Sequence, residues 1–242
     1  MGKPRANSHA PGRTARAGRR VAGRRPRSSK LPHLSDHRRM HEAAWSRKDA
    51  AYLDSSARRA TQDPTLLWKR VGLRRGQVVV DVGAGSGFFS FPAASRVGEE
   101  GRVYAVDISS ELVQFVREKA DRARVTNIEP VLSTLERIPL EDAVADITLL
   151  ANVLHGIPPA TVTEAVRVLR PGGKLVNVDW KKEPTPEGPD VRHRLSPAEA
   201  ATTLSAYGLT RLDSFDLGPY HYVLIFERPL PARRPGRLVS AE

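Results

Sequence analysis

The 242-residue chain has no cysteine. This absence excludes disulfide bonds, thiolate metal sites and cysteine nucleophiles, and it fits a reducing compartment. No apolar run approaches the roughly 18 residues that a membrane-spanning helix needs. No apolar segment follows the basic N-terminus, as it would in a signal peptide. We therefore expect a cytoplasmic protein with no membrane span, no metal site and no cysteine-based chemistry.

Acidic residues are scarce at the N-terminus. Residues 1–39 contain one of them, Asp36, beside twelve Lys or Arg, so they carry +11 of the formal net charge of +12. Large apolar side chains are almost absent from residues 1–34, and we predict that residues 1–39 form a disordered Arg-rich tail. This tail could bind RNA or another polyanion, direct import into an organelle, or be a dispensable extension upstream of a start at Met40. Residues 229–242 are predicted to form a second, flexible tail.

The segment between these tails, residues 40–228, alternates between helix-like and strand-like patterns. Residues 40–60 favour a helix, and Asp63-Pro64 favours the start of another that ends at about Val71. Further strands are predicted over 78–82, 103–106, 127–132, 146–151, 175–178, 210–216 and 221–227, and helices over 87–97, 109–122, 158–169 and 197–208. The turn at Gly218-Pro219 is too short for a crossover helix, so the last two strands must be antiparallel. The prediction is an α/β fold with a doubly wound, Rossmann-like seven-stranded sheet, mostly parallel with an antiparallel last strand.

A glycine-rich loop, Asp81-Val82-Gly83-Ala84-Gly85-Ser86-Gly87, follows the first predicted strand. Alternate glycines allow a tight turn and close approach of a ligand, and the next helix offers free N–H groups to an anion. Asp107 ends the second predicted strand. A carboxylate at this position suits the binding of ribose hydroxyls; the alternative is an ordinary acidic residue at a helix N-terminus. The loop alone does not separate a nicotinamide dinucleotide site from other cofactor sites.

The order of the motifs resembles the class I S-adenosylmethionine-dependent methyltransferases, particularly the small bacterial type-11 and quinone-biosynthesis-like domains. The resemblance covers about residues 64–228, with the core domain beginning at Asp63-Pro64. Beside the glycine loop and the strand ending in Asp107, it rests on Ile138-Pro139-Leu140, on Val168-Leu169-Arg170-Pro171-Gly172-Gly173 and on the terminal hairpin. A Pro-Gly-Gly turn into the fifth strand and an antiparallel last strand are not typical of dehydrogenases. The resemblance implies an enzyme that uses S-adenosylmethionine as cofactor.

The resemblance also implies a cofactor site at the carboxyl ends of the strands. The residues that it assigns to the methionine end are Asp81, Gly83, Ala84, Gly85 and Gly87; those assigned to the ribose and adenine are Asp107, Ile108, Thr134 and Leu135; and Asn152 is assigned to the pocket floor. The family commonly has an acid at the position of Thr134, so this chain departs from the pattern at the adenine edge.

Candidate acceptor-side residues follow the fourth and fifth predicted strands. His155 is the candidate general base, because its unperturbed pKa of about 6.5 suits proton transfer, although it could also be structural. Trp180 and Lys181 are candidate substrate-binding residues at the same rim. The residues Tyr220, His221 and Tyr222 are expected to pack in the hairpin, and His193 and Arg194 are expected in a solvated loop.

The leading hypothesis is methyl transfer to a small molecule. The Asn/Asp-Pro-Pro-Tyr/Phe motif of enzymes that methylate adenine or glutamine nitrogens is missing after the fourth strand, where the chain reads Ala151-Asn152-Val153-Leu154-His155. Alternatives are an RNA- or protein-modifying methyltransferase that uses residues 1–39 to hold a polyanion, a cofactor-binding protein without catalysis, and a nicotinamide-dependent oxidoreductase. The sequence indicates neither the acceptor nor an oligomeric state.

Overall fold

The computed structural model describes residues 46–231. The predictions for residues 1–39 and for the far C-terminal tail therefore fall outside the described residues. The strands are β1 (Val78–Val82), β2 (Arg102–Asp107), β3 (Ile128–Leu132), β4 (Ala145–Ala151), β5 (Leu169–Trp180), β6 (Thr210–Leu217) and β7 (His221–Glu227). The helices are η1 (Arg47–Asp49), α2 (Ala50–Leu53), α3 (Ser56–Thr61), α4 (Pro64–Val71), α5 (Ser90–Val97), α6 (Ser110–Ala123), α7 (Pro159–Arg167), η2 (Val191–His193) and α8 (Pro197–Ser205).

The seven strands form one sheet in the order β3-β2-β1-β4-β5-β7-β6. All neighbouring pairs from β3 to β5 are parallel, whereas β7 runs antiparallel to both β5 and β6. The predicted fold class is therefore confirmed. The strand order reverses between β1 and β4, and in such sheets ligands bind outside the carboxyl ends of the strands at this point.

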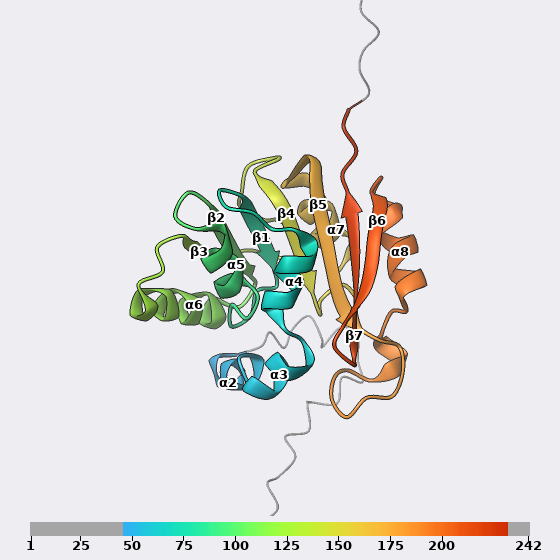
Figure 1. Cartoon of the computed structure of the whole chain (residues 1–242), viewed down its shortest axis with the longest axis horizontal. Helices are drawn as coiled ribbons and strands as arrows, with labels where there is room; N and C mark the ends of the chain where they lie inside the picture. Colours follow the sequence, from blue (N-terminus) through green and yellow to red (C-terminus); the bar gives the residue numbers. More distant parts are fainter. Residues whose placement is uncertain (1–45, 232–242) are drawn as a thin grey trace, which may run out of the picture. The chain divides into compact units, whose positions relative to one another are not determined.

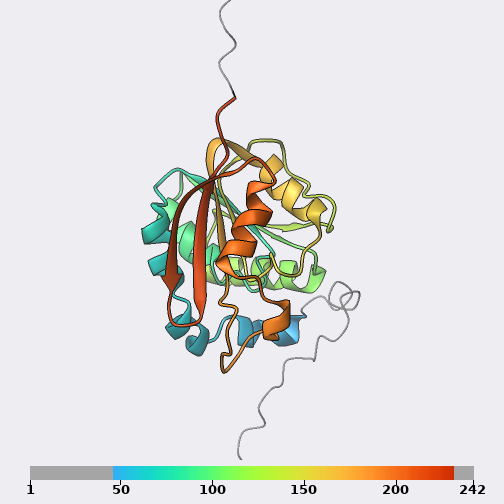
Figure 2. The ribbon, with the colours of Figure 1, turned by 90° about the vertical axis from the view of Figure 1, so that its right-hand side faces the viewer.

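Helices cover both faces of the sheet. One apolar core lies between the sheet and helices α4, α5 and α6, and includes the fully buried Trp68, whose indole N–H donates to the carbonyl of Phe89 at 2.9 Å. The other core lies under α7 and α8, which contribute Val162 and Leu204. Figure 1 shows α4 and α5 against one face, and Figure 2 shows α8 beside the hairpin of β6 and β7.

Two helices begin where the sequence predicts a helix start. Asp63 caps α4 by accepting from the N–H of Thr65, with Pro64 at the first helical position. Ser196 caps α8 through a reciprocal capping box with Glu199. Side chains that satisfy free backbone N–H groups thus begin these helices where the sequence motif predicts.

Three predicted boundaries are wrong. The described part of 40–60 is not one helix, because Ser46 and Ser55 each accept a backbone N–H and begin separate short segments. The helix predicted from residue 87 begins at Ser90, since the glycine loop extends through Phe89. The helix predicted over 158–169 ends at Arg167, and β5 begins at Leu169.

The Pro171-Gly172-Gly173 segment is a bulge inside β5 rather than a turn before it. Leu169 pairs with Ala145 and Lys174 pairs with Ile147, so the intervening residues of β5 loop out. Gly173 suits this position, because a Cβ there would lie 2.7 Å from the Leu169 side chain.

No helix within residues 46–231 is long and apolar enough to cross a membrane.

Candidate functional site

The glycine loop leaves β1 in a conformation that needs its glycines. Gly83, Gly85 and Gly87 have φ values of 74°, 58° and 77°, a region that side chains other than glycine rarely adopt. A Cβ at Gly83 would lie 2.7 Å from the side chain of Val153, and one at Gly87 would lie 2.9 Å from the ring of Phe91. The alternate glycines therefore let the loop turn sharply against its neighbours.

Asp107 at the end of β2 is hydrogen-bonded to the glycine loop. Its Oδ2 accepts from the N–H of Gly85 at 2.8 Å, and its Oδ1 accepts from the N–H of Ser109 at 2.9 Å. Burial raises the pKa of the carboxyl, although these N–H groups favour its charged form. These two hydrogen bonds fix the orientation of the Asp107 carboxylate at the carboxyl edge of the sheet, between the glycine loop and the start of α6.

Apolar side chains are exposed next to Asp107. Ile108 is 37% exposed and Leu132, the last residue of β3, is 52% exposed. The sequence analysis did not assign Leu132, although a large apolar residue at the ligand-binding end of a strand was the available signal. The hydroxyl of Thr134 accepts from the N–H groups of Glu136 and Arg137 at 3.2 and 3.0 Å. The carbonyl of Leu135 accepts from the hydroxyl of Thr161. The segment is therefore held in a defined turn.

Asp81 lies in β1 immediately before the loop and is 1% exposed. The hydroxyl of Ser90 donates to its Oδ2 at 2.6 Å. Burial raises the pKa of Asp81 to about 6, against the opposing effects of Ser90 and Arg58. Burial of a carboxylate without a full ion pair is energetically unfavourable, so the charged form of Asp81 destabilises the folded protein.

Helices α2 and α3 lie at the carboxyl ends of the parallel strands (Figure 1). Gln62, which follows α3, exchanges hydrogen bonds of 3.2 Å with Asn152 at the end of β4. Asn152 has a left-handed backbone with φ of 59°. The predicted pocket-floor residue therefore contacts the N-terminal segment, which the sequence patterns did not assign to the site.

His155, which follows β4, is paired with a carboxylate of β5. Its Nδ1 lies 3.0 and 3.1 Å from the two carboxylate oxygens of Asp179, near the end of β5. The His155 side chain is 10% exposed and that of Asp179 is fully buried. Burial disfavours the imidazolium, but the attraction of Asp179 outweighs it and raises the pKa of His155. Within the described residues Nε2 has no hydrogen-bond partner, so it is available to a ligand.

Trp180 and Lys181 differ in their surroundings. The Trp180 ring lies against His221, with centroids 4.1 Å apart, and under the guanidinium of Arg194 at 5.2 Å. Lys181 is ion-paired with Asp216 of β6 at 2.7 Å. Trp180 therefore packs against the hairpin and the loop after β5, whereas the charge of Lys181 is engaged with the neighbouring strand.

The expectation of a solvated loop at Arg194 is wrong. Arg194 is 3% exposed and donates to four backbone carbonyls and one hydroxyl between residues 181 and 189. A single guanidinium thus holds the loop after β5 in place, which offsets the cost of its burial. The packing expected for the hairpin holds for His221 and Tyr222, which are buried.

Comparisons with known proteins agree with this geometry. The family described as "Methyltransferase domain" matches residues 80–177. A solved SAM dependent methyltransferase from Aquifex aeolicus is 31% identical, with a TM-score of 0.73, and the alignment covers 76% of this chain and 99% of that one. The chain belongs to the S-adenosylmethionine-dependent methyltransferases.

Other relatives of this methyltransferase match a smaller part of the chain. The Ubiquinone/menaquinone biosynthesis C-methyltransferase UbiE of Idiomarina loihiensis is 32% identical over 124 residues, which are 48% of this chain and 49% of that protein. The chain thus spans about half the length of the curated relatives that it matches. The [4+2]-Cyclase SpnF shares the fold, with a TM-score of 0.60 at 17% identity over 69% of this chain and 80% of that one. The fold by itself therefore does not specify methyl transfer.

Family membership confirms the predicted class and its cofactor, S-adenosylmethionine, and resolves the ambiguity of the glycine loop. The residues at the carboxyl edge fit this molecule. The glycines keep the loop free of side chains in its tight turn, and the Ser86 hydroxyl is buried without a hydrogen-bond partner in the described part of the chain. Exposed apolar side chains flank an oriented carboxylate, as an adenosine requires.

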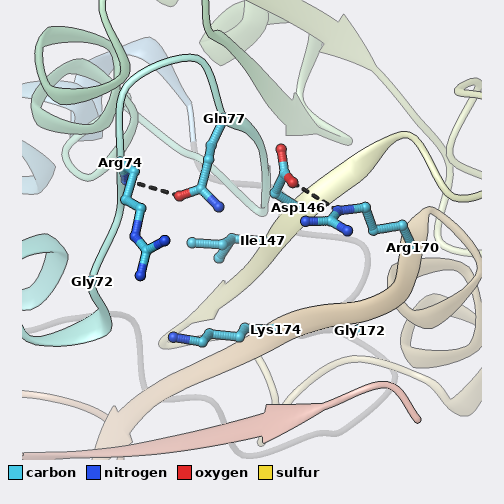
Figure 3. Close-up of a pocket in the computed structure, with 8 residues that line it drawn as sticks. All are labelled: Gly72, Arg74, Gln77, Asp146, Ile147, Arg170, Gly172 and Lys174. Carbon is cyan, nitrogen blue, oxygen red and sulfur yellow. Dashed lines mark hydrogen bonds and ion pairs between the residues drawn. The ribbon is translucent and has the colours of Figure 1, made fainter. Parts of the chain in front are cut away.

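A pocket of about 170 Å³ lies at the opposite end of the sheet. Gly72, Arg74 and Gln77, before β1, line it together with Asp146, Ile147, Arg170, Gly172 and Lys174 (Figure 3). Asp146 is ion-paired with Arg170 at 2.7 Å, and the Lys174 ammonium donates to the carbonyl of Val71 at 3.0 Å. These residues lie at the amino ends of β1, β4 and β5, away from the carboxyl edge where ligands bind in such sheets.

Proposed function

We propose that this chain transfers the methyl group of S-adenosylmethionine to a small-molecule acceptor, with His155 as the general base. The observation that carries the proposal is the pair of His155 and Asp179 at the carboxyl ends of β4 and β5. The central strand β1, which leads into the glycine loop, is the direct neighbour of β4. A base and a cofactor cradle are therefore adjacent at the point where the strand order reverses.

The cofactor-binding roles form part of the same proposal. The methionine end would lie against Gly83, Ala84, Gly85 and Gly87, with Asp81 near its ammonium. Asp107 would accept from the ribose hydroxyls, and the adenine would lie between Ile108, Leu132 and the turn at Thr134 and Leu135, above Asn152. The exposure of Ile108 and Leu132 supports this placement, because exposed apolar side chains often mark ligand-binding surfaces.

The cofactor supplies an electrophilic methyl group on a sulfonium that leaves as a neutral thioether. Nε2 of His155 would accept the acceptor's proton as the methyl carbon bonds to the acceptor atom and its bond to sulfur breaks. Asp179 accepts from Nδ1–H, which places the lone pair on Nε2 and stabilises the imidazolium. Orientation of the two reactants can contribute roughly 7–11 kcal/mol, and a positioned base about 10²–10⁴-fold in rate.

The pair of His155 and Asp179 favours an acceptor that carries an ionisable O–H or N–H group. A base is useful only where a proton must leave, and His155 is both oriented and raised in pKa by Asp179. The curated relatives' name, which refers to ubiquinone and menaquinone biosynthesis, supports hydroxylated aromatic rings as the first acceptors to test.

The test is transfer of labelled methyl from S-adenosylmethionine to a panel of phenols and hydroxyquinones, with the full chain. His155→Ala should reduce kcat about 10²-fold or more while S-adenosylhomocysteine still binds. Below the raised pKa of His155, kcat/KM should fall as pH falls, because the base becomes protonated. Asp179→Asn removes the attraction that raises this pKa, so the acid limb should move to lower pH and the maximal rate should fall.

Asp121→Asn is the matched control, since Asp121 is exposed on α6. An unchanged pH profile in Asp179→Asn, or full turnover in His155→Ala, would refute the base. Cofactor binding without turnover of any acceptor would instead favour a binding protein without catalysis. The RNA- or protein-modifying alternative depends on residues 1–39, and it stays a prediction, as does the cytoplasmic location.

A further inference from the structure

Arg58 on α3 is a half-buried cation that has no ion-pair partner among residues 46–231. Its Nη1 donates to the carbonyl of Leu53 at 2.7 Å and its Nε donates to Oε1 of Gln62 at 3.0 Å. Its Cζ lies 4.2 Å from the centroid of the Phe88 ring. None of these partners is an anion, and within residues 46–231 no carboxylate lies within ion-pair distance of Arg58. Burial lowers the pKa of Arg58 to about 10, although Tyr52, Asp81 and Asp54 oppose this shift.

The contacts of Arg58 place its guanidinium at the glycine loop. The side chain of Leu53, whose carbonyl Arg58 binds, lies 3.4 Å from where a Cβ on Gly85 would be. Phe88, under the guanidinium, directly follows Gly87, the last glycine of the loop. Gln62, the other hydrogen-bond partner, binds Asn152 at the end of β4. The guanidinium therefore lies between α3 and the segment proposed for the methionine end of the cofactor.

We propose that Arg58 binds the α-carboxylate of the cofactor's methionine moiety, so that α3 contributes directly to the cofactor site. This proposal rests on the proposed function above. A buried cation that lacks a counter-ion is destabilising, and an anion that binds it recovers much of that cost. Two of the five N–H donors of Arg58 are used in the described structure, and the remaining donors suit the two oxygens of a carboxylate.

The charges at this end of the site then match those of the ligand. The amino-acid end of S-adenosylmethionine carries one ammonium and one carboxylate. Asp81 is the buried anion available to the ammonium, and Arg58 is the half-buried cation available to the carboxylate; the two attract each other. Removal of either charge should therefore affect a different group of the ligand.

The test compares two ligands by calorimetry with the full chain. One is S-adenosylhomocysteine, and the other is its decarboxylated analogue, which keeps the ammonium and lacks only the carboxylate. Arg58→Ala should weaken S-adenosylhomocysteine about 10- to 100-fold, the loss of a charge-assisted contact, and should change the affinity of the analogue less than about 3-fold. Arg58→Lys should recover part of the loss. Arg59→Ala is the matched control, because Arg59 is the exposed neighbour on the same helix.

Each outcome separates the possible roles of Arg58. Equal losses for both ligands would mean that Arg58 only holds α3 in place, which would overturn the proposal, as would unchanged binding of S-adenosylhomocysteine. A carboxylate-specific loss in Arg59→Ala would also overturn it. Failure of the wild-type chain to bind either ligand would refute the proposed function itself. Thermal unfolding of each variant identifies any that do not fold, and Arg58→Lys then serves as the test variant.

Discussion

Asp81→Asn should stabilise the cofactor-free protein at neutral pH. Asp81 is 1% exposed, and its carboxyl pKa of about 6 in the folded protein exceeds the ordinary value of 3.8 by about 2 units. Each unit corresponds to about 1.4 kcal/mol, so the buried charge costs at most about 3 kcal/mol above pH 6. Asparagine has the same shape, and its Oδ1 still accepts from the hydroxyl of Ser90. Loss of the attraction between Asp81 and Arg58 makes the actual gain smaller.

The raised pKa of Asp81 also determines how the free energy of unfolding changes with pH. Because the folded-state pKa of Asp81 is raised, the folded protein binds more protons than the unfolded chain between about pH 4 and pH 6. The free energy of unfolding of the wild type should therefore fall as pH rises through this window. The advantage of Asp81→Asn should be largest at pH 7.5 and smaller by about 2 kcal/mol at pH 4.5.

Urea unfolding at pH 4.5 and 7.5 measures these differences, with the exposed Asp121→Asn as control. The reasoning is refuted if Asp81→Asn is less stable than the wild type at both pH values, or if the difference between them does not change with pH. The same variant should bind S-adenosylhomocysteine at least 10-fold more weakly, because the counter-charge of the ammonium is gone. Such a result would show that this acid is retained for binding at the expense of stability.

Three further predictions concern the loop, the ribose site and α7. Gly83→Ala should destabilise by more than Gly208→Ala in thermal unfolding, because both glycines have φ near 75° but only at Gly83 would the Cβ meet Val153; Val153→Ala should reduce the excess. Asp107→Ala should weaken both S-adenosylhomocysteine and 5′-methylthioadenosine about 10²-fold in calorimetry, since both ligands contain the ribose. Hydrogen bonds from Arg167 lower the pKa of the buried Glu164 to about 2. Glu164→Gln should therefore lower the free energy of unfolding by about 3 kcal/mol or less at pH 7, and this loss should disappear as pH falls through 2.

These predictions have distinct refutations. Equal destabilisation by the two glycine substitutions would show that the loop can move away from β4. Retained affinity in Asp107→Ala would remove that residue from the ribose site. A pH-independent effect of Glu164→Gln in chemical unfolding would mean that packing, rather than the carboxylate's charge, holds the loop at Ile138 against α7.

The strands and most helices could be predicted because their signals are local. β-branched runs such as Val78–Val82 are typical of buried parallel strands, and a cap such as Asp63-Pro64 begins a helix wherever the chain contains it. The glycine loop and Asp107 could also be predicted, because each lies at the end of a strand that the sequence predicts. The bulge in β5 was not predicted, because a Pro-Gly-Gly segment forms a turn or a bulge depending on the neighbouring strand.

The amino-acid sequence was sufficient for the α/β topology, the glycine loop and the carboxylate at the end of β2. Only the tertiary structure brought His155 to Asp179 across 24 residues, and Gln62 to Asn152 across 90. It also showed that Arg58, unassigned in the sequence, is a half-buried cation without an ion-pair partner among the residues that the structure describes. The physical reason is that periodicity and caps depend on neighbours along the chain, whereas pairing, burial and pKa depend on side chains that meet only after the strands are ordered in the sheet.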